Sequence, residues 1–175
     1  MLLLGEFQTS VRKALDEVDS DWKEYEGLVV CGTHAPKDVE MIIDEIKRAR
    51  ESDTPFLGIC AGLQFMAIEI ARNIFGIKDA TSEEFSRQGT FVVRKIPSLE
   101  VGIREVKSEY GVTMESFWHN YEVDPKYFHE KSVPVDVMTL GSLRHFVGVQ
   151  FHPEYQSSKQ RPHPILVKFL HACSV

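Results

Sequence analysis

The segment Thr54–Gln64 constrains the fold of this chain more than any other stretch, because it joins a buried strand to a helix through one sharp turn. An apolar run is followed by Gly58, Cys60 and Gly62 at alternate positions, and then by apolar residues at helical spacing. The two glycines permit a tight turn and a close approach of the helix to the strand. This pattern predicts an elbow that lifts the Cys60 side chain above the edge of a sheet.

Strands and helices alternate through the first half of the chain. Short apolar runs at Leu2–Leu4 and Gly27–Cys31 predict buried strands, and helices are predicted to follow from about Thr9 and from Pro36. A third helix follows the elbow, with Gly76 at its C-terminal cap. Such alternation predicts right-handed β–α–β units around a parallel sheet.

The second half reads as strands separated by turn residues. These predicted strands are Phe91–Ile96, Val101–Val106, Phe117–Val123, Val135–Leu140 and Leu143–Phe151. Gly141 and Ser142 favour a hairpin between the last two, and a closing helix is predicted from about Pro164. Because no long linker or repeat divides the chain, residues 1–175 are expected to form one α/β domain with a mainly parallel central sheet flanked by helices.

The charge balance and the cysteines indicate which ligands and which cellular compartment to expect. With a net charge of −6 and no basic stripe, it is not expected to bind nucleic acid or an anionic membrane. The cysteines Cys31, Cys60 and Cys173 match neither a disulfide framework nor a zinc-binding spacing, which favours a reduced, cytoplasmic environment. The histidines show no metal-ligand spacing, so neither a metal nor another cofactor is expected. No apolar stretch is long enough for a signal peptide or a membrane span.

A second segment, Gly148–Glu154, supplies the groups that a nucleophilic cysteine needs. It ends an apolar strand in His152, a candidate base, and Glu154, a carboxylate that can orient the imidazole. Cys60 would stand at a helix N-terminus, where the helix dipole favours the thiolate and the N–H of Ala61 points toward an oxyanion. A lone buried cysteine, or a strand-terminal histidine beside an acid, is ordinarily structural, but the elbow favours a Cys–His–Glu triad.

The loop Cys31–Ala35 lies where ligands bind in such folds, between a buried strand and a helix at the carboxyl edge of the sheet. The backbone N–H groups of Gly32 and Thr33 could complete an oxyanion hole. A simple connection between strand and helix is an equally good interpretation of this loop.

Taken together, these motifs resemble the class I glutamine amidotransferases, and most closely the glutaminase domain of the CTP synthases. The segments that carry the resemblance are Pro55–Gln64, Ala67–Asn73, Ala80–Phe85, His119–Val123 and Val149–Tyr155. The resemblance implies a flavodoxin-like three-layer fold and a cysteine thioester mechanism that releases ammonia from glutamine, within pyrimidine nucleotide biosynthesis. It also implies glutamine-binding positions at Gln64 and at Glu84, whose carboxylate would hold the substrate amino group. A synthase subunit that receives the ammonia is the implied partner.

Three departures from the family pattern leave alternatives open. Asn120 stands where the family has an arginine for the substrate α-carboxylate, and an uncharged group would bind it more weakly. Arg87, Arg94 or a residue of a partner are candidates to replace that charge. The loop at Thr33 lacks the usual glycines, the N-terminal section is shorter than in the family, and the ATP-using synthase domain is not expected in this chain. An alternative is hydrolysis of another γ-glutamyl or small amide substrate, which Asn120 favours, and another is a non-catalytic regulatory relative, which the altered loop favours.

Overall fold

A five-stranded sheet lies at the centre of the computed structural model, which describes residues 1–34, 36–128 and 135–175. In spatial order its strands are β1 (Leu2–Leu4), β2 (Leu28–Val30), β3 (Phe56–Ile59), β8 (Phe146–Val149) and β7 (Val137–Thr139). The first four are parallel, and β7 pairs antiparallel with β8 at one edge. The predicted mainly parallel sheet and the hairpin at its end are therefore confirmed.

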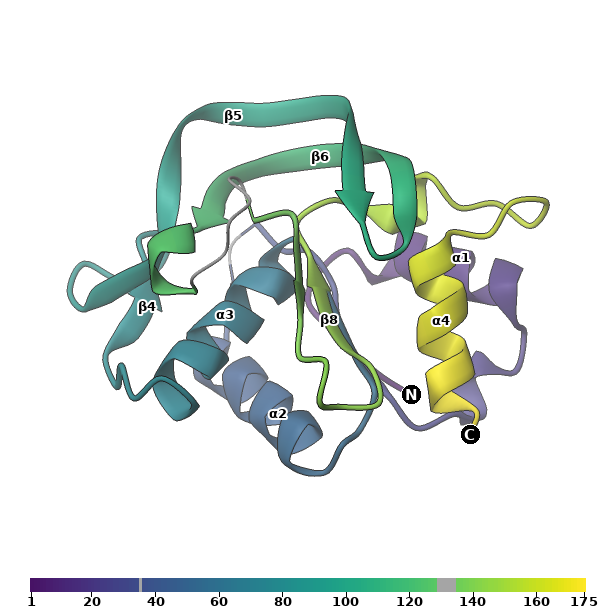
Figure 1. Cartoon of the computed structure of the whole chain (residues 1–175), viewed down its shortest axis with the longest axis horizontal. Coiled ribbons are helices and arrows are strands. Elements are labelled where there is room, and N and C mark those ends of the chain that lie inside the picture. Colours follow the sequence, from purple (N-terminus) through teal and green to yellow (C-terminus); the bar gives the residue numbers. More distant parts are fainter. Residues whose placement is uncertain (35, 129–134) are drawn as a thin grey trace.

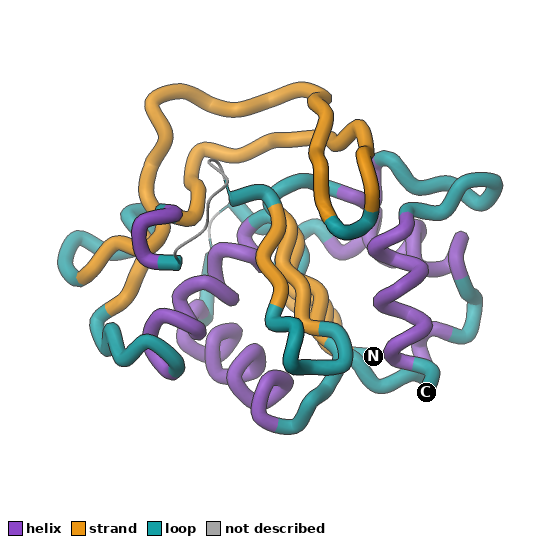
Figure 2. Tube along the Cα trace, in the orientation of Figure 1, coloured by secondary structure: helices purple, strands orange, loops and turns teal. Residues whose placement is uncertain are grey.

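Helices cover both faces of this sheet, as Figures 1 and 2 show. The helices are α2 (Val39–Glu51) and α3 (Ala61–Asn73) on one face, and α1 (Gln8–Val18) and α4 (Pro164–Cys173) on the other. Side chains of β2 alternate between the layers: Leu28 and Val30 pack with α2 and α3, whereas Val29 packs with α1 and α4. This alternation gives two apolar cores and the predicted three-layer arrangement.

The two crossovers at the N-terminal edge of the sheet have opposite hands, because α1 and α2 lie on opposite faces. Both connections move to the adjacent parallel strand in the same direction, from β1 to β2 and from β2 to β3. The prediction of uniformly right-handed units is therefore wrong for one of them. The apolar stripe of α1, which includes Val11 and Leu15, is buried in the same core as α4, and this packing keeps α1 on that face.

A second sheet contains a long two-stranded ribbon that arches over the central sheet (Figure 1). The strands of this sheet are β4 (Ala80–Ser82), β5 (Thr90–Ser108) and β6 (Gly111–Val123), and the ribbon is formed by β5 and β6. The prediction of two separate strands within β5 is wrong, since β5 continues through Pro97. The pairing register with β6 shifts between Lys95 and Glu100, so the proline sits where no ladder hydrogen bond is required.

Other boundaries differ from the sequence prediction by a few residues. α2 begins at Val39 rather than Pro36, after Asp38 with a φ of 55°, and the strand predicted over 143–151 shrinks to β8. α4 begins at Pro164 as predicted, where the His163 ring accepts the N–H of Ile165 as a cap. Short 3-10 turns complete the described elements: η1 (Trp22–Glu24), η2 (Pro125–Tyr127) and η3 (Pro153–Tyr155). No helix within the described ranges is long and apolar enough to span a membrane.

Candidate active site

The turn between β3 and α3 holds Cys60 in a strained backbone conformation. Its φ of 54° and ψ of −105° lie in a region that residues with a side chain rarely adopt. The Cys60 N–H donates to the Val149 carbonyl oxygen at 2.7 Å, which anchors the turn to the neighbouring strand β8. The turn therefore places Cys60 at the carboxyl edge of the sheet and at the N-terminus of α3.

The glycines around the elbow are required by close packing of α3 on the sheet. A Cβ at Gly62 would overlap the Val30 carbonyl oxygen, and a Cβ at Gly58 would lie 2.6 Å from the Gly62 carbonyl carbon. A Cβ at Gly148 on β8 would lie 2.8 Å from a methyl carbon of Leu63. α3 can approach the three strands this closely only because these positions lack side chains.

His152 and Glu154 lie beyond the end of β8, where the chain turns into η3. His152 Nδ1 and Glu154 Oε1 are 2.9 Å apart, and both side chains are buried. The His152 N–H donates to the Ser116 carbonyl oxygen of β6 at 2.8 Å, and the Tyr155 ring stacks on the imidazole with centroids 5.1 Å apart. The imidazole is thus fixed by β6, Glu154 and Tyr155, with its Nδ1 committed to the carboxylate.

The surroundings of His152 favour its protonated form. Burial disfavours the charged ring, but interactions with the Cys60 sulfur and the Glu154 carboxylate outweigh burial and raise the pKa of His152 to about 10. The Cys60 sulfur and the Glu154 carboxylate thus both favour the imidazolium form of His152. An imidazolium beside a cysteine sulfur stabilises the thiolate, which is the nucleophilic form.

Two further groups contact the Cys60 sulfur, and sequence reasoning assigned a role to neither. The Cys60 Sγ lies 3.8 Å from the Trp118 carbonyl oxygen, and Gln150 Nε2 donates to Sγ at 3.7 Å. The Trp118 contact uses a backbone atom, so its side chain gives no signal in the sequence. Gln150 could have been found, because it follows β8 as Cys60 follows β3, and these two strands are paired in register.

The loop after β2 lies directly against the catalytic candidates. A Cβ on Gly32 would lie 3.2 Å from His152 Cε1 and 3.7 Å from Cys60 Cβ. Within the described ranges, the N–H groups of Gly32 and Thr33 have no hydrogen-bond acceptor, and the first turn of α3 leaves the Ala61 N–H unpaired. These donors are available to an oxyanion, whereas the predicted loop residue Ala35 lies outside the described residues.

A cavity of about 450 Å³ opens at this edge of the sheet. It brings together all but one of the residues predicted for the site: Cys60, His152, Gly32, Thr33, Ala61, Gln64, Glu84 and Asn120. Glu154 does not line the cavity and acts on it through the His152 ring. Among the described lining residues there is no lysine or arginine. Arg87 and Arg94 are not among them, and Arg94 pairs with Glu122 at 2.9 Å, so the suggestion that they supply the missing charge is wrong for this structure.

Glu84 is the one carboxylate among the described residues that line the cavity. Its side chain is half-buried, and burial raises the pKa of Glu84 to about 7. A bound cation would favour the ionised form, so this carboxyl group is suited to receive an ammonium group at neutral pH.

Comparisons with known proteins agree with this geometry. The model of the family described as "Glutamine amidotransferase class-I" matches residues 5–172. The CTP synthase of Thermotoga maritima is 34% identical over 190 aligned residues, which cover 87% of this chain and 36% of that protein. The CTP synthase of Bdellovibrio bacteriovorus is 35% identical over 184 residues, covering 84% and 34%. The chain thus spans about a third of the length of these relatives.

A solved structure has the same fold. The glutaminase domain of Trypanosoma brucei CTPS, with bound acivicin, superposes with a TM-score of 0.85 and covers 99% of this chain and 94% of that one. The sequences are 22% identical in this comparison, so the likeness is one of fold.

Proposed function

Since this chain belongs to the class I glutamine amidotransferase family, we propose that it hydrolyses the side-chain amide of glutamine and releases ammonia. A glutamine substrate is typical of this family. The observation that carries the proposal is a strained Cys60 that faces a cavity beside the buried pair of His152 and Glu154. We further propose that residues 1–175 act as one amidotransferase domain.

The reaction proceeds through a covalent thioester. The Cys60 thiolate attacks the amide carbon, and the N–H groups of Ala61, Gly32 and Thr33 stabilise the oxyanion that forms. The His152 imidazolium gives its proton to the departing nitrogen, which leaves as ammonia. The carbon–nitrogen bond is broken and the carbon–sulfur bond of a γ-glutamyl thioester remains.

Water completes the cycle. The neutral His152 ring takes a proton from water as its oxygen attacks the thioester carbon, and glutamate leaves as the Cys60 thiolate is regenerated. Glu154 keeps the proton on Nδ1, so the other ring nitrogen serves as base and acid in turn. Each turnover therefore consumes one glutamine and one water and returns His152 to its protonated state.

Substrate recognition uses the other residues that line the cavity. Gln64 binds the substrate from the first turn of α3, Glu84 accepts the α-ammonium group, and Asn120 makes a neutral contact with the α-carboxylate. Because no arginine or lysine of the described lining can meet that carboxylate, free glutamine is expected to bind weakly.

Glutamine binding should weaken as the pH falls below about 7. Protonated Glu84 cannot accept an ammonium ion, and burial holds its pKa at about 7. The dissociation constant should then rise by up to about tenfold for each pH unit below 7. Calorimetric titration of glutamine into the Cys60→Ala variant between pH 5.5 and 8 (~0.5-unit steps) measures this without turnover. Glu84→Gln is the control and should bind weakly with a flat profile; a flat wild-type profile contradicts the role of Glu84.

Restoring the missing charge should improve the use of glutamine. A charge-assisted hydrogen bond is worth roughly 1.5–3 kcal/mol, so Asn120→Arg should lower KM for glutamine by about ten- to a hundredfold. Asn120→Gln, which lengthens the side chain without adding charge, should leave KM close to the wild-type value. The inference from Asn120 is wrong if wild type already has a micromolar KM and Asn120→Arg does not change it.

Two alternative functions are each supported by one specific observation. Asn120 also suits a γ-glutamyl or small amide substrate that has no free α-carboxylate. The loss of loop glycines at Thr33 suits a regulatory relative that binds a metabolite without turnover. Production of glutamate and ammonia from glutamine, compared with γ-glutamyl-p-nitroanilide and asparagine, separates these cases. Turnover of glutamine supports the proposal, turnover of another amide alone supports the second substrate class, and no turnover of any supports the regulatory function.

We place the activity in the cytoplasm and in a role like that of the CTP synthases in pyrimidine nucleotide biosynthesis. In that role a synthase partner accepts the released ammonia. Adding a candidate synthase with its nucleotide substrates to the assay should raise glutamine turnover if the two proteins form one enzyme.

A further inference from the structure

A buried amide lies against the Cys60 sulfur without lining the cavity. Ile59 and Val149 are paired in the parallel register of β3 and β8, so the next residues, Cys60 and Gln150, leave the sheet side by side. The Gln150 side chain is 1% exposed, and its Nε2 donates to the sulfur at 3.7 Å. Gln150 therefore acts on the sulfur without occupying the space in which a substrate binds.

The backbone carbonyl of Tyr121 sets the orientation of the Gln150 amide through the side chain of Gln64. The Tyr121 carbonyl oxygen can only accept a hydrogen bond, so Gln64 must turn its Nε2 toward it, at 2.8 Å. The same nitrogen then presents its second hydrogen to Gln150 Oε1, at 3.4 Å. With its oxygen held by Gln64, Gln150 has only its NH₂ group left to face Cys60.

The N–H donor of Gln150 offsets an unfavourable contact between the Cys60 sulfur and a backbone carbonyl oxygen. The Trp118 carbonyl oxygen lies 3.8 Å from Sγ, where it accepts a hydrogen bond from the neutral thiol but repels the thiolate. We propose that Gln150 is a positioning residue that holds Cys60 in its thiolate form, with its amide aligned by Tyr121 through Gln64. This inference rests on the proposed function only in taking Cys60 as the nucleophile. A hydrogen bond from a neutral amide to an anion is stronger than one to a neutral thiol, so its effect falls on the ionised sulfur.

Several titratable groups face Cys60 from the elements around it and are unchanged in the variants below. His152 approaches from the segment after β8, Tyr155 from η3 and His119 from β6, and His34 and Glu84 line the same cavity. Glu154 acts through the His152 ring. Because these groups are the same in wild type and variants, a difference in the ionisation of Cys60 between them comes from the substitution of Gln150.

Alkylation of Cys60 by iodoacetamide at different pH values tests the proposal. The rate follows the thiolate fraction, and peptide mapping assigns the label to Cys60. Gln150→Met keeps the volume but removes the donor, and should raise the apparent pKa of the alkylation profile by about one unit. At pH values below the wild-type midpoint the rate should fall roughly tenfold, while the plateau at high pH stays at the wild-type level. The matched control is Gln156→Met, since Gln156 Nε2 donates to Ser116 Oγ at 2.7 Å and not to the sulfur.

A second substitution keeps the test decisive if Gln150→Met does not fold. Gln150→Glu has the same shape and can still accept the Gln64 hydrogen bond, but presents an oxygen to the sulfur, so its midpoint should shift further upward than that of Gln150→Met. Profiles of both variants that overlay the wild type overturn the proposal, as does a lower plateau with an unchanged midpoint, which means altered access. Alkylation needs no amide turnover, so the result stands whether or not glutamine proves to be the substrate.

Discussion

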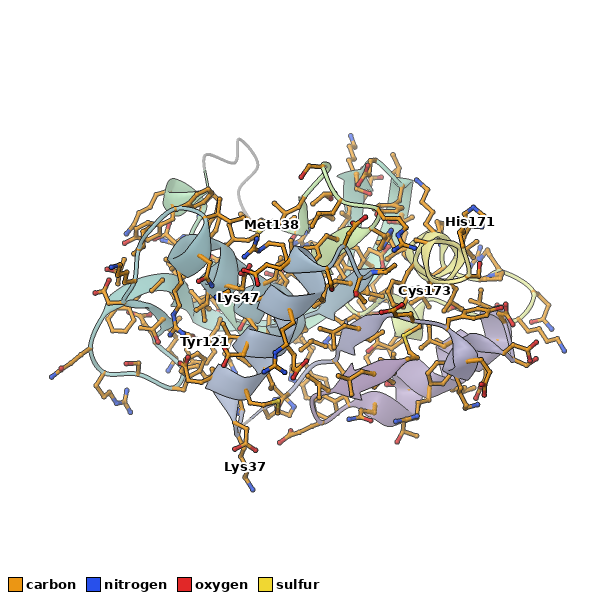
Figure 3. All side chains as sticks on the ribbon, turned by 90° about the horizontal axis from the view of Figure 1, so that it is seen from below. Lys37, Lys47, Tyr121, Met138, His171 and Cys173 are labelled. Carbon is orange, nitrogen blue, oxygen red and sulfur yellow. The ribbon has the colours of Figure 1, made fainter. Side chains whose placement is uncertain are left out.

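Replacing Cys60 with alanine is expected to lower kcat/KM for amide hydrolysis by at least about 10⁴-fold, because the covalent step then has no nucleophile. Neither of the other thiols can substitute. Burial raises the pKa of Cys31 to about 12 and that of Cys173 to about 12, so both stay protonated at neutral pH. Figure 3 shows Cys173 on the side of α4 toward the N-terminal segments, where a Cβ on Gly27 would lie 2.7 Å from its sulfur.

The matched control is Cys173→Ala, which removes a buried thiol far from the cavity lining and should leave kcat/KM within about twofold of wild type. Production of glutamate and ammonia gives the rates, and a glutamine-like electrophile followed by peptide mapping gives the reactive residue. Residual turnover in Cys60→Ala, or preferential labelling of Cys31, would show that the nucleophile has been assigned to the wrong residue.

Gly62→Ala is expected to cause the largest loss of stability. The added methyl group would overlap the Val30 carbonyl oxygen, and neither the backbone of β2 nor that of α3 can move without disturbing both apolar cores. Overpacking against backbone should lower the free energy of unfolding by about 3 kcal/mol or more. Urea denaturation followed by circular dichroism measures this value.

Gly141→Ala provides the comparison, since a Cβ at Gly141 meets no atom within 4 Å. Its effect on the free energy of unfolding should stay within about 0.5 kcal/mol. If Gly62→Ala were as stable as Gly141→Ala, the close approach of α3 to β2 would not exist in solution.

The elbow could be predicted from the sequence because all of its signals are local. Gly58, Cys60 and Gly62 lie within one turn of chain, and the apolar residues on either side fix a strand and a helix. The gathering of Gly32, Glu84 and Asn120 at one cavity was also expected, since the first lies after a predicted strand and the other two were given by resemblance. Their roles in binding remain predictions.

What could not be predicted depends on how distant segments pair. The continuity of β5 through Pro97 depends on a register shift against β6, which no pattern within β5 reveals. The contact of Gln150 with Cys60 likewise requires the in-register pairing of β3 with β8. The side of the sheet that α1 covers is set by its packing with α4, a helix from the other end of the chain.

The strained backbone of Cys60 affects which substitutions at position 60 would stabilise the fold. A left-handed conformation with a side chain costs about 1–3 kcal/mol, which a glycine at the same place would largely avoid. Once amide hydrolysis was no longer under selection, drift at position 60 would therefore favour residues that relax the turn and stabilise the fold. A cysteine is instead present at the position where a small, catalytically inert residue would be more stable.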